Sequence, residues 1–329
     1  MTEAFNLKNE YGCFRTRITL ESASASNWQS DTIAGYLVHT LALIEEESAV
    51  KDFRDECNSG RPPFVVSNGF PPGCLPLPFM PLPPIAPNLG KQERISCRLE
   101  IERWKDVRYV DTATFSRVIS GASLETIPFK EDISGGDSAW DGRVTWKNTI
   151  NRATGTTLEE GAGGLFDFAE IISKEVDIYF LIRNDYPAHL RKLLDTMKEE
   201  GYGKRRTAGY GQIKEIGPLE ICDLFSKVEN PDGFVSLSNF IPAATDPTHG
   251  FWHTLVKYGK IGEGISTDKP FKKPLVMLEA GSCFLYSPVR PFYGRIVAGI
   301  NKSHPEVFQF GYALGVPMRF PDHVLQILR

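Results

Sequence analysis

The pattern of apolar and polar residues along the chain predicts short strands and amphipathic helices in mixed order. Residues 13–20 alternate between the two classes, which indicates a half-buried strand. Apolar residues recur at helical spacing from Ser30 to about Glu46, so we expect a helix there with Ser30 as its N-cap. Residues 186–200 show the same helical spacing and predict a second helix.

Two strand-like runs, 165–172 and 176–183, precede this second helix, and three residues separate them as in a hairpin. A further strand-like run, 211–216, comes after it. The order of strand, helix, strands, helix and strand predicts a ferredoxin-like βαββαβ unit. Residues 218–329 contain several short strand-like runs and predict a second α+β unit. The expected boundaries are therefore 1–217 and 218–329.

Two segments interrupt the first unit. Residues 61–88 are too rich in proline for a helix and too apolar for a free linker, which favours an extended strap packed over the surface. A polyproline ligand for an SH3-like partner is the alternative for this segment. Residues 105–160 are less regular, and Arg143, Trp146 and Lys147 mix charge with an aromatic ring on a predicted inserted hairpin.

Composition limits the classes of function. The chain has 329 residues and a net charge of −4, which argues against a protein that coats nucleic acid without specificity. Positive charge is local, because residues 257–273 contain five lysines against Glu263 and Asp268. The six cysteines form no CxxC pair, so we expect no zinc site, no disulfide framework and no cofactor. No run reaches transmembrane length, which predicts a cytoplasmic protein without a membrane partner.

The loop at residues 201–211 holds four glycines, three consecutive cations and two tyrosines. Cations suit phosphates and flat rings suit bases, so the loop is a candidate RNA contact. It lacks the Gly-Lys-Ser/Thr ending of a P-loop, which disfavours a nucleoside triphosphate. The alternative is a helix C-cap, in which Gly201 or Gly203 ends the helix and the cations favour its dipole.

Four stretches of the chain resemble the RAMP superfamily of CRISPR proteins, and in particular the type III-A (Csm-type) subunit that caps the 5′ handle of the guide RNA. They are residues 28–37, 62–78, 151–157 with the following 165–166, and the glycine loop at 203–211. A weaker match covers residues 309–317. The stretches span most of the chain in the expected order.

The resemblance implies an α+β fold with two ferredoxin-like (RRM-like) domains, the glycine-rich loop and an inserted β-hairpin thumb that reaches into the guide–target duplex. It implies binding to the guide RNA, to the large signature subunit and to backbone RAMP subunits, without a catalytic residue. The alternative within the superfamily is a metal-independent endoribonuclease that processes guide precursors, with His39 as general acid–base. A third class is a protein–protein adaptor that uses the proline strap.

The candidate RNA contacts follow from the chemistry of the residues together with the resemblance to the RAMP superfamily. They are Trp28, Ser30, Thr32, Arg143, Trp146, Lys147, Asn151, Arg152, Tyr202, Gly203, Lys204, Arg205, Arg206, Gly209 and Tyr210. Each has a structural alternative: Ser30 as a helix cap, Trp28 and the tyrosines as packed rings, and the hairpin residues as ordinary cross-strand pairs. His249 and His253 have i,i+4 spacing, but the neighbouring Pro247 and Gly250 disfavour a helix and hence a metal site.

Overall fold

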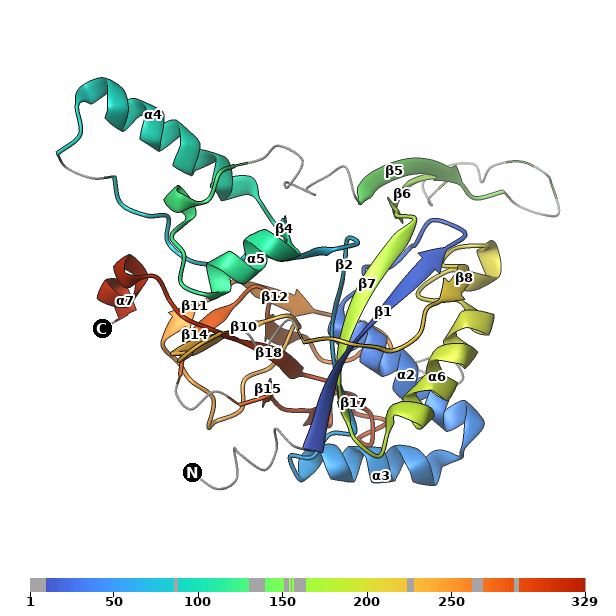
Figure 1. Ribbon diagram of the computed structural model, residues 1–329. Helices are drawn as coiled ribbons and strands as arrows, with labels where there is room; N and C mark the ends of the chain where they lie inside the picture. Colours follow the sequence, from blue (N-terminus) through green and yellow to red (C-terminus); the bar gives the residue numbers. More distant parts are fainter. Residues whose placement is uncertain are drawn as a thin grey trace.

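The computed structural model describes residues 10–85, 88–129, 140–150, 154, 156, 164–223, 228–261, 269–286 and 290–328. Its helices are α2 (Ser30–Ile44), α3 (Glu47–Asn58), α4 (Lys91–Glu102), α5 (Thr112–Ile119), α6 (Pro187–Glu200) and α7 (Asp322–Leu328), with 3-10 turns η1 (Arg103–Asp106), η2 (Leu124–Thr126) and η4 (Arg206–Ala208). Its strands are β1 (Tyr11–Leu20), β2 (Phe64–Phe70), β3 (Cys74–Pro76), β4 (Tyr109–Asp111), β5 (Asp141–Asn148), β6 (Leu165–Ile172), β7 (Glu175–Arg183), β8 (Ile213–Ile216), β9 (Glu220–Ile221), β10 (Gly233–Ser236), β11 (Gly250–Phe251), β12 (Thr254–Lys257), β13 (Leu275–Leu278), β14 (Cys283–Leu285), β15 (Phe292–Gly294), β16 (Val297–Ala298), β17 (Phe308–Gln309) and β18 (Tyr312–Met318). The whole is a mixed α/β structure with antiparallel sheets (Figure 1).

The central sheet has the strand order β2-β7-β1-β8, and β9 also pairs with β1. Every neighbouring pair is antiparallel. The chain enters this sheet in the order β1, α2, β2, β7, α6, β8, with α2 and α6 together on one side of it (Figure 1). β7 is buried over Val176–Ile182, because it lies inside the sheet and is covered on both faces.

The predicted hairpin between residues 165–172 and 176–183 is wrong. β6 pairs with β5 over its full length, from Asp141↔Ile172 to Asn148↔Leu165, whereas β7 pairs with β1 and β2. The short turn at Ser173 and Lys174 therefore passes the chain from one sheet to another. The β5–β6 hairpin lies near the ends of β7 and β1 (Figure 1).

The proline-rich segment enters the central sheet instead of lying only on the surface. Its apolar part forms β2, which pairs with β7 on one side. On the other side, the Asn68 N–H donates to the Leu237 carbonyl at 2.8 Å. Prolines stand before and after β2, where no ladder donor is lost.

The second sheet has the order β11-β14-β10-β18-β15. Its apolar residues, such as Val235 and Val316, join the same core cluster as Val65 of β2. In the described part of residues 228–328, α7 is the only helix, and it follows the last strand. The predicted C-terminal ferredoxin-like unit is therefore not seen there, since that plan places helices between strands. No described helix combines the length and the apolar character that crossing a bilayer requires.

Candidate nucleic-acid interface

The glycine loop joins the end of α6 to β8, and its backbone is bonded to the segment after β1. The Gly211 N–H donates to the Ala23 carbonyl at 2.8 Å, and the Lys204 N–H donates to the Ser26 Oγ at 3.0 Å. The loop residues with positive φ are Gly201, Gly203, Arg205, Gly209 and Gly211. Glycine is needed at most of these positions, because residues with a side chain rarely adopt a positive φ. Gly201 also ends α6, so the C-cap alternative and a binding role coexist in one loop.

The glycines differ in what approaches them. A Cβ on Gly211 would lie 1.9 Å from the Tyr202 carbonyl oxygen, and one on Gly203 would lie 2.8 Å from the Ser26 Cβ. Around Gly209, no atom of the described residues comes within 4 Å of that position. Close approach at Gly203 is thus made by the protein itself, whereas Gly209 leaves room for another molecule.

Side chains of the loop and of the β5–β6 hairpin form one cluster. The Lys147 Nζ lies 4.3 Å from the ring centroid of Phe168 and 4.2 Å from that of Tyr210, to whose hydroxyl it also donates. The Arg205 guanidinium lies 4.6 Å from the Phe168 centroid. These cation–π contacts join the loop and the hairpin into a single positively charged surface.

The three cations of the loop are not equivalent. Lys204 is exposed, and its side chain has no hydrogen bond or ion pair with the part of the chain that the structure describes. The Arg206 guanidinium donates to Glu200 at 3.0 Å and to the Tyr36 hydroxyl at 2.8 Å. Lys204 and Arg205 therefore present charge to solvent, whereas Arg206 holds the loop against α2 and α6.

Trp28 and Tyr202 lie in the core, so the packing alternative holds for both rings. They stack on each other with centroids 3.9 Å apart, and both are buried. The Tyr202 hydroxyl donates to the Asn27 carbonyl at 3.0 Å, and burial raises its pKa well above the usual value. Neither ring has a face to offer a base. Tyr210 is half-buried against Phe168.

The polar groups at the start of α2 are bonded to other parts of the same chain. Gln29, not Ser30, is its N-cap residue, and the Ser30 N–H donates to the Asn68 Oδ1 at 2.8 Å. The Ser30 Oγ donates to the Asn239 carbonyl and accepts from the Asn239 N–H. Ser30 is completely buried, and its polar groups join the two halves of the chain, which favours a structural role over the predicted RNA contact. Thr32 accepts from Lys257 at 3.2 Å.

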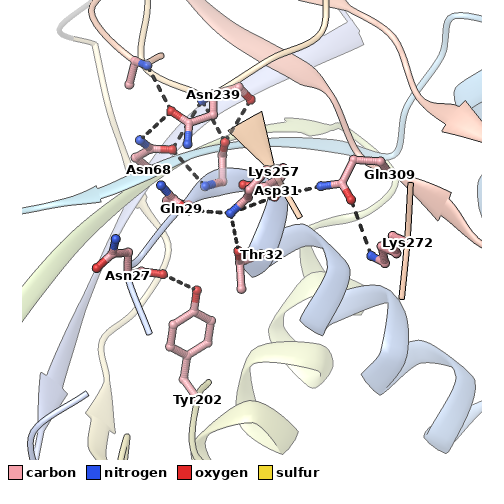
Figure 2. Close-up of polar contacts among 12 residues, drawn as sticks. Asn27, Gln29, Asp31, Thr32, Asn68, Tyr202, Asn239, Lys257, Lys272 and Gln309 are labelled. Carbon is pink, nitrogen blue, oxygen red and sulfur yellow. Dashed lines mark hydrogen bonds and ion pairs between the residues drawn. The ribbon is translucent and has the colours of Figure 1, made fainter. Parts of the chain in front are cut away.

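A polar cluster between α2 and the second half of the chain was not predicted (Figure 2). The buried Asp31 forms an ion pair with Lys257 at 3.1 Å and accepts from the Gln309 Nε2 at 2.7 Å. Lys272 donates to the other end of Gln309 at 3.4 Å, and burial lowers the pKa of this lysine, with Asp31 opposing the shift. The lysine-rich segment 257–273 was visible in the sequence. Its partner Asp31 could not be predicted, because the two are far apart along the chain.

The outer face of the β5–β6 hairpin is exposed and carries apolar side chains beside Asp167, the cross-strand partner of Trp146. Trp146 is 66% exposed, and Val144 and Leu165 lie on the same face by the strand register. Arg143 is exposed opposite Glu170. The Thr145 hydroxyl donates to Glu170 at 2.7 Å, which lowers the pKa of that carboxyl. Asn151 and Arg152 lie outside the described residues, so their predicted roles stay predictions.

The candidate histidines lie in different surroundings. His39 is half-buried on α2, about 14 Å along the helix axis from Ser30, at 1.5 Å per residue. His253 stacks on Phe79 with centroids 4.0 Å apart. Among the described residues, no group of three or more His, Cys, Asp or Glu side chains has the arrangement to hold a metal ion.

Comparison with solved structures gives the fold. A Csm1–Csm4 cassette in complex with cA4 contains a chain that superposes with a TM-score of 0.59 at 15% identity, covering 94% of this chain and 99% of that one. The Csm3–Csm4 subcomplex of a type III-A interference complex matches with a TM-score of 0.56 at 13% identity, covering 93% and 99%. Csm4 is the component common to both assemblies, and it is the matching chain.

This chain has a Csm4-like fold. The similarity extends over nearly the full length of both chains. No protein-family profile matches the sequence. No curated protein matches it either. The Csm4-like fold agrees with the resemblance that the sequence motifs indicate.

Proposed function

We propose that this chain is a non-catalytic, RNA-binding subunit of a type III CRISPR effector complex. In this role it binds the 5′ handle of the guide RNA and anchors the large signature subunit in the cytoplasm. The observation that carries the proposal is the Csm4-like fold over 94% of the chain. The glycine loop adds support, because it presents Lys204 and Arg205 beside an exposed hairpin.

The surface formed by the glycine loop and the β5–β6 hairpin suits a sugar–phosphate backbone better than a pocket for a single base would. Lys204 and Arg205 supply charge for phosphates, and Gly209 leaves open space at the same loop. Lys147 joins this surface from the hairpin side. Trp28, Ser30 and Tyr202 hold the loop and α2 in place from beneath and take no part in contact.

The β5–β6 hairpin fits the role of the thumb. Its exposed Trp146 faces away from the glycine loop, where it is positioned to wedge into a stacked guide–target duplex. We assign Asn151 and Arg152, which follow β5 in the sequence, to the same contact. The βαββαβ order of the central sheet supports a ferredoxin-like first domain within residues 1–217, with residues 218–329 as the second domain.

The test is purification of the tagged chain from its host, followed by sequencing of the bound RNA. We expect short RNAs that share one repeat-derived 5′ end, together with co-purifying large and backbone subunits. Random fragments or no RNA would contradict handle binding, and the adaptor class would then replace it.

A binding assay on the purified protein with handle RNA localises the contact. We expect Lys204→Ala/Arg205→Ala to flatten the dependence of log affinity on log salt by about 1.4, at 0.7 per lost single-strand phosphate contact. Lys51→Ala/Lys192→Ala is the matched control, since both lysines are exposed on other helices. Cleavage of repeat RNA in EDTA that depends on His39 would instead support the endoribonuclease.

A further inference from the structure

The β12–β13 hairpin carries an exposed row of apolar and aromatic side chains. On its outer face, Val256 and Val276 are cross-strand partners that are 67% and 60% exposed. Tyr258, in line with Val256, is 61% exposed, and Phe271 is 50% exposed. A contiguous group of this kind on a surface marks a binding site, because burying it would be favourable.

The described part of the same hairpin carries charge of one sign. The described residues 252–261 and 269–278 contain five lysines and no acidic residue, in a chain whose net charge is −4. The Lys260 Nζ lies 5.3 Å from the Phe271 ring centroid. Lys257 pairs with Asp31 on the inner side, whereas Lys260 is exposed beside Phe271. A surface that combines exposed rings with such a cation suits a polyanion with flat groups more than a protein partner or a lipid.

The rings are arranged as a stacking platform. Tyr258 and Phe271 are parallel, with an interplanar angle of 7° and centroids 5.4 Å apart. Each ring supports the other on one face, which fixes their orientation before a ligand arrives. Nucleobases stack on such rings regardless of sequence, and adjacent cations then contact the phosphates.

The inner face of the hairpin connects this platform to the glycine loop. Lys257 points inward to Asp31 and donates to Gln29. Two residues before Gln29, the Asn27 carbonyl accepts from Tyr202 of the glycine loop. Figure 2 shows Tyr202 bonded to Asn27 and Lys257 bonded to Gln29 and Thr32, so the loop and the hairpin both contact the start of α2 and the residues before it.

The geometry points to a second RNA contact, in which the outer face of β12–β13 stacks bases of a single-stranded segment on Tyr258 and holds its phosphates with Lys260. It rests on the proposed function in taking RNA as the ligand, but it uses none of the residues assigned to handle binding. The platform needs no base sequence, so it would bind single-stranded RNA of any composition.

The test uses the full-length protein and a fluorescent 20-nucleotide oligouridine, with fluorescence anisotropy as the readout. We expect Tyr258→Ala to weaken binding about tenfold, since one base stack is lost. Tyr258→Phe should retain wild-type affinity, because stacking needs the ring and not the hydroxyl. Lys260→Ala should flatten the salt dependence by about 0.7.

Two controls separate stacking from general surface effects. Ile327→Ala removes an equally exposed apolar side chain from α7, and Lys51→Ala removes an exposed cation from α3. Both should bind like the wild type. Thermal unfolding of every variant identifies misfolding, and Tyr258→Leu keeps apolar bulk without the ring if Tyr258→Ala is unstable.

The outcomes distinguish this inference from the proposed function. If Tyr258 and Lys260 variants bind normally while Lys204→Ala/Arg205→Ala does not, the platform is overturned and handle binding stands. The reverse result supports the platform and removes the handle site. If Tyr258→Ala loses a co-purifying protein but keeps RNA affinity, the face is a protein contact and the inference fails. Crosslinks from a 4-thiouridine oligonucleotide should map to residues 252–261 or 269–278; crosslinks confined to other regions overturn it.

Discussion

Single residues of the glycine loop show how one residue type can serve different purposes. Gly209 and Gly211 both have positive φ, at 85° and 65°. At Gly209, only the backbone angle requires glycine, because the described surroundings are empty. At Gly211, the neighbouring Tyr202 backbone also occupies the place of a side chain. Sequence spacing alone treats the two as equal members of one motif.

This contrast predicts different stabilities for two alanine variants. Gly209→Ala should cost about 1 to 2 kcal/mol, the usual penalty for a side chain in the left-handed region. Gly211→Ala should cost about 3 kcal/mol or more, because the Tyr202 carbonyl must move and its support of Trp28 is disturbed. Thermal unfolding measures both. Equal losses of melting temperature would show that the clash at Gly211 relaxes at little cost.

At the scale of elements, the β5–β6 hairpin separates folding from binding on its two faces. The inner face packs Lys147 and Phe168 against the glycine loop, whereas the outer face leaves Trp146 in solvent. Packing on one side therefore stabilises the hairpin without using the exposed ring.

Trp146→Ala should leave the melting temperature within about 1 °C of wild type, since surface substitutions away from packed features change little. We expect it to weaken binding to a guide–target duplex by several-fold while binding of single-stranded handle RNA is unchanged. Phe168→Ala is the matched variant on the inner face and should lower the melting temperature. A large stability loss from Trp146→Ala would show that its ring packs within the protein.

Helices and strands could be predicted where the local residue pattern determines them. The pairing between strands could not be predicted. The helical spacing of Leu190, Leu194 and Met197 predicted α6, and the alternation after Cys13 predicted β1. The pairing of β6 with β5 was missed because a three-residue gap before β7 resembles a hairpin turn. The insertion of β2 was missed because its flanking prolines disfavour a strand in general, although they are tolerated at its ends.

At the scale of the whole molecule, the two halves are joined through buried polar groups as well as apolar ones. Asp31 of α2 is buried and pairs with Lys257 of β12, 226 positions later. Such a pair cannot be derived from sequence, because neither local spacing nor composition connects the two positions. The sequence showed the lysine run as local positive charge and the start of α2 as a candidate RNA contact; in the structure they are directed in part at each other.

The Asp31–Lys257 pair can be measured with a double-mutant cycle. Asp31→Asn alone should destabilise the protein by about 3 kcal/mol, because Lys257 and the buried Lys272 lose their counter-charge. Lys257→Gln should restore part of this loss in the double variant. Chemical unfolding of the four proteins gives the coupling energy. Additive losses would show that the pair does not join the two halves.

The pairing of β1 has a consequence for the order in which the protein is made. β1 is an inner strand whose partners β7, β8 and β9 lie between Glu175 and Ile221. At about 5–20 residues per second, a ribosome needs roughly 10 to 30 seconds between completing β1 and producing β7. During that interval the first strand has no neighbour in the sheet. Nascent chains of this protein should therefore be a target for chaperones that bind exposed strands, and truncation before Glu175 should yield aggregates instead of a smaller folded unit.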